Sequence, residues 1–80
     1  MNIPADLVFE KIKSYLLEFR QQGYVPSYIL IKSKFDLSCF STKKKDYQMF
    51  LDVDLHINDK MESDIEIGDK YSRNVMKRIL

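Results

Sequence analysis

The amino-terminal part of the chain has the clearest pattern of apolar and polar positions. Its apolar residues recur mainly at spacings of three and four, with charged residues between them, which is typical of an amphipathic helix. We predict a helix from about residue 4 to 22, with Asn2 as its N-cap and Pro4 in its first turn. Gly23 can adopt the left-handed conformation that ends a helix, and Pro26 prevents the helix from resuming. The apolar stripe consists of Leu7, Val8, Ile12, Tyr15, Leu16 and Phe19.

Beyond Pro26 the pattern changes to the period of two that strands have. Tyr28–Ile31 is a run of aromatic and aliphatic residues, which predicts a short strand. Tyr47–Ile57 alternates between apolar and mostly polar positions, which favours a long strand. After a turn that begins at residues 58–60, Asp64–Gly68 predicts a third strand. The residues expected to face the core from the last two strands are Met49, Leu51, Val53, Leu55, Ile57, Ile65 and Ile67.

Residues 33–41 fit two structures. With a period of two, their apolar residues continue the face of the preceding strand, and we favour this strand because the alternation is sustained. With a helical period, Ser33 caps a helix whose Phe35, Cys39 and Phe40 face the core. The polar run that follows is expected to be a connecting loop.

The last residues are expected to form a short helix capped by Ser72, with one apolar and one basic side. The predicted fold is therefore α+β in the order α-β-β-β-α. A three-stranded antiparallel meander lies under both helices, which pack on its apolar face and leave the other face in water. A chain of this length makes one small domain, residues 1–80. The apolar side of the last helix consists of Val75, Met76, Ile79 and Leu80.

Composition excludes several classes of protein. Hydrophobic residues make up 45% of the chain and charged residues 31%, which is ordinary for a globular domain and unlike collagen or a disordered chain. The single cysteine, Cys39, excludes a disulfide framework, and we expect a reduced, inert thiol in a cytoplasmic protein. No run of about 18 apolar residues occurs, and Asp6 precedes the first basic residue, so we expect neither a membrane span nor a signal peptide.

The residue types that catalysis needs are scarce. The two glycines, Gly23 and Gly68, stand alone, so no glycine-rich loop can cradle a phosphate. Cys39 and His56 are the one pair that could form a Cys-His site, and Cys39 lies in an apolar run where a thiol is expected to be buried. We therefore expect a protein that is not an enzyme and carries no cofactor.

The face of the predicted long strand opposite the core carries Phe50, Asp52, Asp54 and His56. The carboxylates and the imidazole could converge on zinc or manganese. One histidine with no cysteine beside it supplies too few strong ligands for such an ion, so we expect no metal. Phe50 could anchor a protein partner at the open edge of the sheet, while the carboxylates steer a basic surface toward it. The alternative is that a curled edge of the sheet or the final helix covers Phe50, which then contributes to stability and not to binding. The pattern favours a non-enzymatic interaction or regulatory protein that binds another protein or a second copy of itself.

The basic residues indicate an alternative, a nucleic-acid-binding module that uses the Lys43–Lys45 loop and the final helix. Residues 1–45 contain eight Lys and Arg against four Asp and Glu, whereas residues 46–80 contain five against eight. Such segregation can produce a basic face that binds phosphates and an acidic face that repels them. The candidate residues are Lys32, Lys34, Lys43, Lys44, Lys45, Lys70, Arg73, Lys77 and Arg78.

Two resemblances add to this interpretation. The predicted α-β-β-β-α order resembles the topology of double-stranded RNA-binding domains. Gly68, Lys70 and Arg73 lie roughly where the basic second helix of that family begins. The chain lacks that family's Gly-Pro-x-His loop and Lys-Lys-x-Ala-Lys run, so the resemblance implies the topology and not the RNA-binding residues. The stretches GYVPSYILIKSKF and FLDVDLHINDKMESDIEIGDKY resemble small proteins of bacteriophages and mobile elements, many of which bind a host or virion protein.

Overall fold

The amphipathic segment at the start of the chain forms the long helix α1 (Ala5–Gln21), as predicted. The computed structural model describes residues 3–80; Pro4 is the N-cap of α1, and Asn2, expected in that role, lies outside the described residues. Gly23 follows the helix with a φ of 92°, a left-handed conformation that glycine adopts at low cost. The buried face of α1 consists of Val8, Phe9, Ile12, Leu16 and Phe19, whereas Leu7 is exposed.

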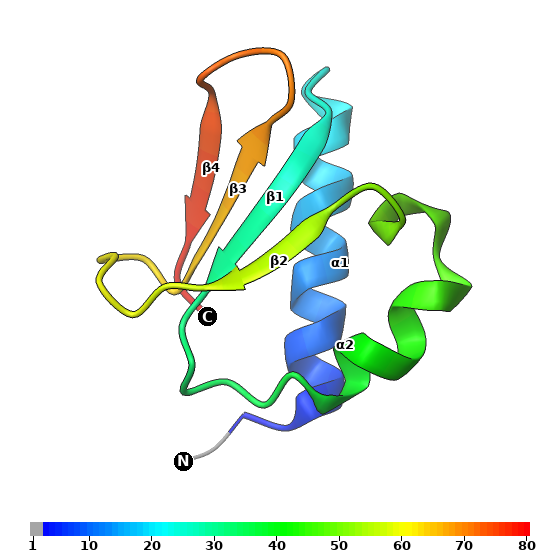
Figure 1. Ribbon diagram of the computed structural model, residues 1–80, viewed down its shortest axis with the longest axis vertical. Coiled ribbons are helices and arrows are strands. Elements are labelled where there is room, and N and C mark those ends of the chain that lie inside the picture. Colours follow the sequence, from blue (N-terminus) through cyan, green and yellow to red (C-terminus); the bar gives the residue numbers. More distant parts are fainter. Residues whose placement is uncertain (1–2) are drawn as a thin grey trace.

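Four strands form one mixed sheet in the order β2-β1-β3-β4 (Figure 1). They are β1 (Pro26–Ile31), β2 (Asp54–Ile57), β3 (Ile65–Asp69) and β4 (Val75–Arg78). β1 and β2 run parallel, whereas β3 is antiparallel to both β1 and β4. The predicted three-stranded antiparallel meander is therefore wrong. A parallel pair needs a crossover connection rather than a tight turn, and the segment between β1 and β2 provides one.

The crossover contains the short helix α2 (Ser38–Lys43) and two 3₁₀ turns, η1 (Lys44–Asp46) and η2 (Gln48–Phe50). The strand favoured for residues 33–41 is wrong; the helical alternative is closer, although α2 begins later than that alternative placed it. In Figure 1 the crossover runs along α1, with α2 beside the amino-terminal half of that helix. Aromatic side chains of α2 and η2 contact α1 there, so packing between distant segments determines the local structure.

The long strand predicted for Tyr47–Ile57 is confirmed only at its end, in β2. Upstream of β2 the chain turns through η2, which reverses the predicted environments of two residues: Phe50 is 1% exposed, whereas Leu51 is 65% exposed. The ring centroid of Phe50 lies 5.3 Å from that of Phe9 and 5.1 Å from that of Phe40. Burial of a phenylalanine side chain contributes about 1.5–3 kcal/mol, a gain that Phe50 would lose on the open face of a strand.

The final helix predicted after Ser72 is also wrong, because those residues form β4. Val75 pairs with Gly68, so the chain adds a fourth strand along the edge of β3. The Ser72 hydroxyl donates a hydrogen bond to Asp69 at 2.6 Å and closes the hairpin loop instead of capping a helix. An isolated helix shorter than about 12 residues has only marginal stability in water, whereas pairing with β3 gives the backbone N–H and C=O groups hydrogen-bond partners. The observed order, α-β-α-β-β-β, is not that of double-stranded RNA-binding domains.

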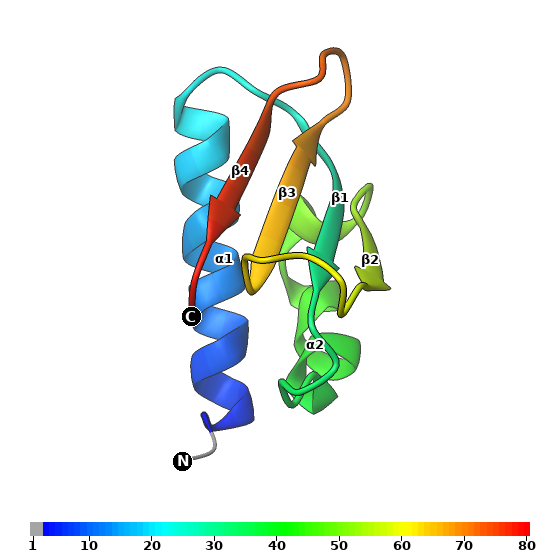
Figure 2. The ribbon, with the colours of Figure 1, turned by 90° about the vertical axis from the view of Figure 1, so that its left-hand side faces the viewer.

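One face of the sheet packs against α1, as Figure 2 shows. Val53 belongs to this core, but Leu51 does not. The apolar face predicted for the strand at residues 47–57 therefore supplies only some of the core residues expected of it. Along residues 3–80 no helix covers the opposite face of the sheet. That face carries polar side chains, as predicted, but also the apolar residues Tyr28, Leu30 and Val75. The inward-facing residues of the sheet include Ile65 and Ile67, as predicted, together with Ile29, Ile31 and Met76.

Candidate functional site

The predicted partner-binding residues separate into a buried and an exposed set. Phe50 lies in the core, so the expectation of an exposed aromatic anchor beside Asp54 is wrong. Asp52 is exposed in the turn before β2, and Asp54 and His56 are exposed on the open face of β2. Because Asp52 lies outside the strand, the three residues do not form the regular row that was considered for a metal ion. Between residues 3 and 80 the structure assembles no group of three side chains able to hold a metal ion.

A groove of about 460 Å³ lies between α2 and β2. Phe40 and Val53 form part of its floor and are each only 4% exposed. Two further apolar residues, Leu37 and Leu55, are half-buried beside them. The polar residues that line the groove are Ser41 and Lys44 on the α2 side and Asp54 and His56 on β2. The groove therefore has an apolar floor and a polar rim, as binding sites commonly do.

β2 is an edge strand, so among residues 3–80 no other strand lies along one side of its backbone. The N–H of Asn58 donates to the carbonyl of Ile31 in β1 at 3.0 Å. Backbone groups of successive strand residues point to opposite sides, so the N–H and C=O groups of Leu55 and Ile57 point away from β1. The Ile57 side chain is also 52% exposed. An extended chain lying in the groove would find these backbone groups free to pair.

The Asp6 carboxylate connects α2 to the start of α1. It accepts hydrogen bonds from Lys43 Nζ at 2.6 Å and from the Cys39 thiol at 3.2 Å. These two hydrogen bonds lower the pKa of Asp6, and the carboxylate in turn raises the pKa of the Cys39 thiol. Cys39 is half-buried in α2 and not in a strand, as the favoured prediction had it. The contacts help to orient the α2 side of the groove, although exposed ion pairs add little stability.

A larger hollow, of about 580 Å³, lies between the loop of residues 58–64 and β4. Met61, Lys77 and Ile79 line it, but Ile79 is exposed and the hollow has no buried apolar floor. The adjacent edge strand β4 also carries Lys77, and lysine is a residue type that discourages strand addition at an edge. We therefore place the candidate site at β2 and not at this larger hollow.

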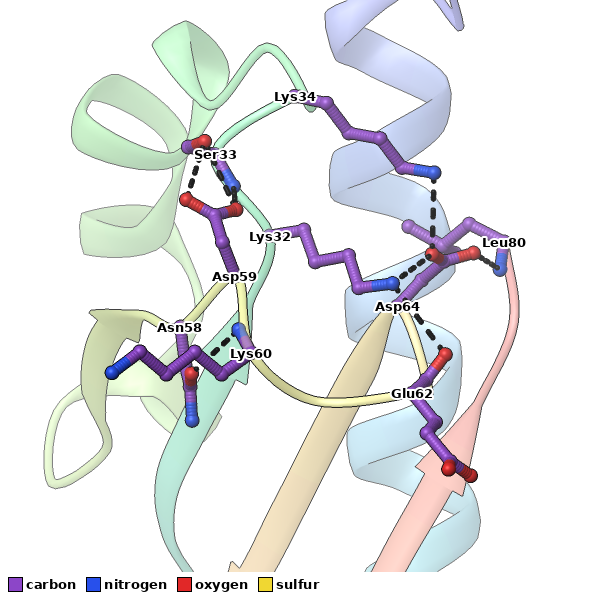
Figure 3. A network of polar contacts seen from close by, with 9 residues as sticks. All are labelled: Lys32, Ser33, Lys34, Asn58, Asp59, Lys60, Glu62, Asp64 and Leu80. Carbon is purple, nitrogen blue, oxygen red and sulfur yellow. Dashed lines mark hydrogen bonds and ion pairs between the residues drawn. The ribbon is translucent and has the colours of Figure 1, made fainter.

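The nine basic residues considered for nucleic acid do not form one surface. Lys32 and Lys34 lie 3.7 and 3.4 Å from the Asp64 carboxylate (Figure 3). The loop that carries Lys70 and Arg73 lies at the other end of the sheet, because β1 pairs with β3 antiparallel. The other five lie elsewhere: Lys43 pairs with Asp6, Lys77 with Glu66 and Arg78 with Glu18, and Lys44 and Lys45 lie in η1.

Asp64 ties together the end of the sheet that Figure 3 shows. Its carboxylate is buried and accepts a hydrogen bond from the N–H of Leu80 at 2.9 Å. Burial, the largest effect, raises the pKa of Asp64, but the Leu80 N–H and two lysine ammonium groups outweigh it, so the pKa lies below its usual value. Asp59 accepts hydrogen bonds from the Ser33 N–H and hydroxyl, both at 2.8 Å, and holds the adjoining loop. The arrangement indicates a structural role for this cluster.

Sequence analysis missed the α2 side of the groove. Leu37 and Phe40 lie in the segment for which a strand was favoured, and their contact with the groove depends on a helix there. The signal that could have found them is the helical alternative, which directed Phe40 toward the core.

Comparisons with known proteins add no relative: scans against family models, curated proteins and solved structures find no match to this chain. The resemblance to small phage and mobile-element proteins therefore stays a prediction. Within the part of the chain that the structure describes, no helix has the length and apolar character needed to cross a membrane.

Proposed function

We propose that this protein acts by binding an extended segment of another protein along the free edge of β2, and not by catalysis. The observation that carries the proposal is the unpaired backbone of β2 beside an apolar groove. A segment in that groove gains main-chain hydrogen bonds from β2 and side-chain contacts from the groove lining, as in other cases of strand addition. In this proposal Asp54 and His56, which line the groove, contribute to the binding surface, and Phe40 takes the role of aromatic contact that was expected of Phe50.

The apolar floor decides whether such binding is strong enough to be useful. Backbone hydrogen bonds contribute about 0.5–1.5 kcal/mol each, so pairing along the short β2 strand gains only a few kcal/mol. Association itself costs about 4–15 kcal/mol in lost translational and rotational freedom. Each apolar side chain buried in the groove adds about 1.5–3 kcal/mol. The side chains buried in the groove must therefore offset most of the cost of association, so we expect the affinity to depend on them more than on backbone pairing.

Nucleic-acid binding has less support from the arrangement of charges. Binding to a phosphate backbone needs several Lys and Arg side chains on one surface. Five of the nine candidate residues lie within ion-pair distance of carboxylates, and the candidates are spread over both ends of the sheet. We expect no measurable binding of a DNA or RNA oligonucleotide at low salt, where such binding is strongest.

The proposal is tested with peptides selected from a displayed random library and with two proline variants. Ile57→Pro removes an N–H that points away from β1. Val75→Pro makes the matched change in the edge strand β4. The carbonyl of Asn74 accepts a hydrogen bond from the N–H of Asp69 in β3, so the N–H of Val75, on the other side of the same peptide group, points away from β3. Proline is tolerated on the solvent side of edge strands, so both variants are expected to fold.

The selected peptides should bind the Ile57→Pro variant about tenfold more weakly than wild type and the Val75→Pro variant unchanged. Bound peptide should also shift the NMR signals of the Leu55 and Ile57 amides. Equal losses in the two variants, or a selection that yields no peptide perturbing these amides, would contradict the proposal.

A further inference from the structure

We infer that the segment bound at β2 alternates apolar with basic residues, the apolar side chains entering the groove and the basic ones lying beside Asp54. This inference rests on the proposed function and specifies its partner. It follows from the two different environments that the two sides of β2 offer.

Strand geometry separates these environments. Asp54 and His56 pair with Tyr28 and Leu30 of β1 and lie on the open face of the sheet, whereas Leu55 pairs with the buried Ile29. A strand added to β2 continues the same alternation, and directly opposite side chains have Cβ atoms about 4.5–5.5 Å apart. Every second residue of the bound segment therefore projects into the groove, and the residues between project onto the open face.

The groove side selects apolar residues and disfavours bases. Its floor is formed by Phe40 and Val53, with Leu37 next to them. The ammonium group of Lys44 lies 5.8 Å from the centre of the Phe40 ring and lines the same groove. A lysine or arginine of the partner pointing into the groove would lose hydration over the apolar floor and be repelled by Lys44. Asp54 and His56 line the groove from its rim on the open-face side, so basic residues of the partner are expected at that rim and not over the apolar floor.

The open face offers a carboxylate for them. Asp54 is exposed, and in the described residues 3–80 neither it nor Asp52, two residues earlier, takes part in an ion pair. Most other carboxylates near the sheet already have partners. Asp64 forms ion pairs with two lysines, and Glu66 accepts a hydrogen bond from the Tyr28 hydroxyl. A cation placed opposite Asp54 gains a cross-strand pair, whereas an acid there is destabilising.

A second copy of this chain is a poorer occupant than a single segment. Phe40 and Ser41 of α2 line the side of the groove opposite β2, so we expect the continuous sheet of a second molecule to meet α2 beyond the first added strand. One extended strand needs only the space between α2 and β2. The partner is therefore a strand-forming segment of a different protein.

The test uses three synthetic octapeptides in which valine alternates with lysine, with glutamate or with threonine. Affinity for the wild-type protein, measured by NMR titration of the Leu55 and Ile57 amides, should be about threefold or more higher for the lysine peptide than for the glutamate peptide at low salt. The difference should shrink at high salt, because exposed charges are screened. Asp54→Lys should remove or reverse the preference, and the matched variant Glu62→Lys, on the exposed loop beyond β2, should leave it unchanged.

The outcomes separate this inference from the proposed function. If no octapeptide and no library-selected peptide perturbs the β2 amides, both fail together. If the glutamate or threonine peptide binds best, or Asp54→Lys leaves the order unchanged, only the inferred charge pattern fails. If the protein is a dimer by mass measurement and Ile57→Pro makes it a monomer, β2 is occupied by a second copy and the inferred partner is wrong.

Discussion

Replacing Phe50 tests the largest difference between the sequence pattern and the structure. Phe50 is buried, with its ring about 5 Å from those of Phe9 and Phe40. A Phe→Ala change in a core costs about 3–5 kcal/mol, against a total stability of about 4–12 kcal/mol for a domain of this size. Phe50→Ala is therefore expected to remove a large share of the total stability, and Phe50→Leu, which stays large and apolar, is the more informative variant.

Phe50→Leu is expected to lower the free energy of unfolding by about 1–4.5 kcal/mol. Apolar exchanges of similar volume usually cost less than about 1.5 kcal/mol, and loss of each ring contact, with Phe9 and with Phe40, adds about 0.5–1.5 kcal/mol. The melting temperature should fall by about 4 °C or more, since about 1 kcal/mol moves it by about 4–8 °C in a small domain. The matched change Leu51→Ala removes an exposed side chain and should stay within about 0.5 kcal/mol of wild type.

Urea unfolding followed by circular dichroism suits this comparison, because the chain has no tryptophan to report by fluorescence. Linear extrapolation gives the free energy of unfolding of each variant. An m value equal to that of wild type would show that the variant and the wild type expose the same surface area on unfolding. The reverse ranking, with Leu51→Ala strongly destabilised and Phe50→Leu close to wild type, would refute the observed packing and restore the predicted long strand.

Three further predictions follow from single contacts. Gly68→Ala should cost about 1–3 kcal/mol in urea unfolding, because the added Cβ would overlap the Tyr28 ring; a cost undiminished in the Tyr28→Ala background would contradict this. Asp64 has a lowered pKa when folded, so its contribution to stability is complete well above its unfolded pKa of about 3.8 and is lost as the pH falls through the folded pKa. Asp64→Asn should therefore cost about 1–3 kcal/mol at about pH 7, and the difference from wild type should close toward about pH 2; a constant difference would argue against the ionised carboxylate. Cys39 should react with a thiol reagent more slowly in the native than in the unfolded chain, and Asp6→Asn should speed the native reaction; equal native and unfolded rates would contradict a passive thiol.

The candidate site was predictable in part. Alternation along the strand was enough to place Asp54 and His56 on an open face, and the structure keeps them there. The groove beside them was not predictable, because Phe40 reaches it from a segment far along the chain and only after that segment has formed a helix. Contacts of this kind carry no local periodicity.

The sequence by itself determined the elements that depend on neighbouring residues. The spacing of apolar residues located α1, and Gly23 ended it. Runs of β-branched residues located β1 and β3, with Ile65 and Ile67 facing inward as predicted. A helical stripe, a terminating glycine and a short alternating strand all act over a few residues, so the local pattern is sufficient.

Only the tertiary structure decided the elements in which two local patterns compete. Residues 75–78 can present apolar side chains from a helix or from a strand, and the open edge of β3 selects the strand. Phe50 alternates like a strand residue, yet its ring is buried against Phe9 from the other end of the chain. The parallel pairing of β1 and β2 depends in the same way on the crossover between them. Periodicity shows which side of a segment is apolar, but the surface that covers that side is supplied by distant residues, and this contact determines the final structure.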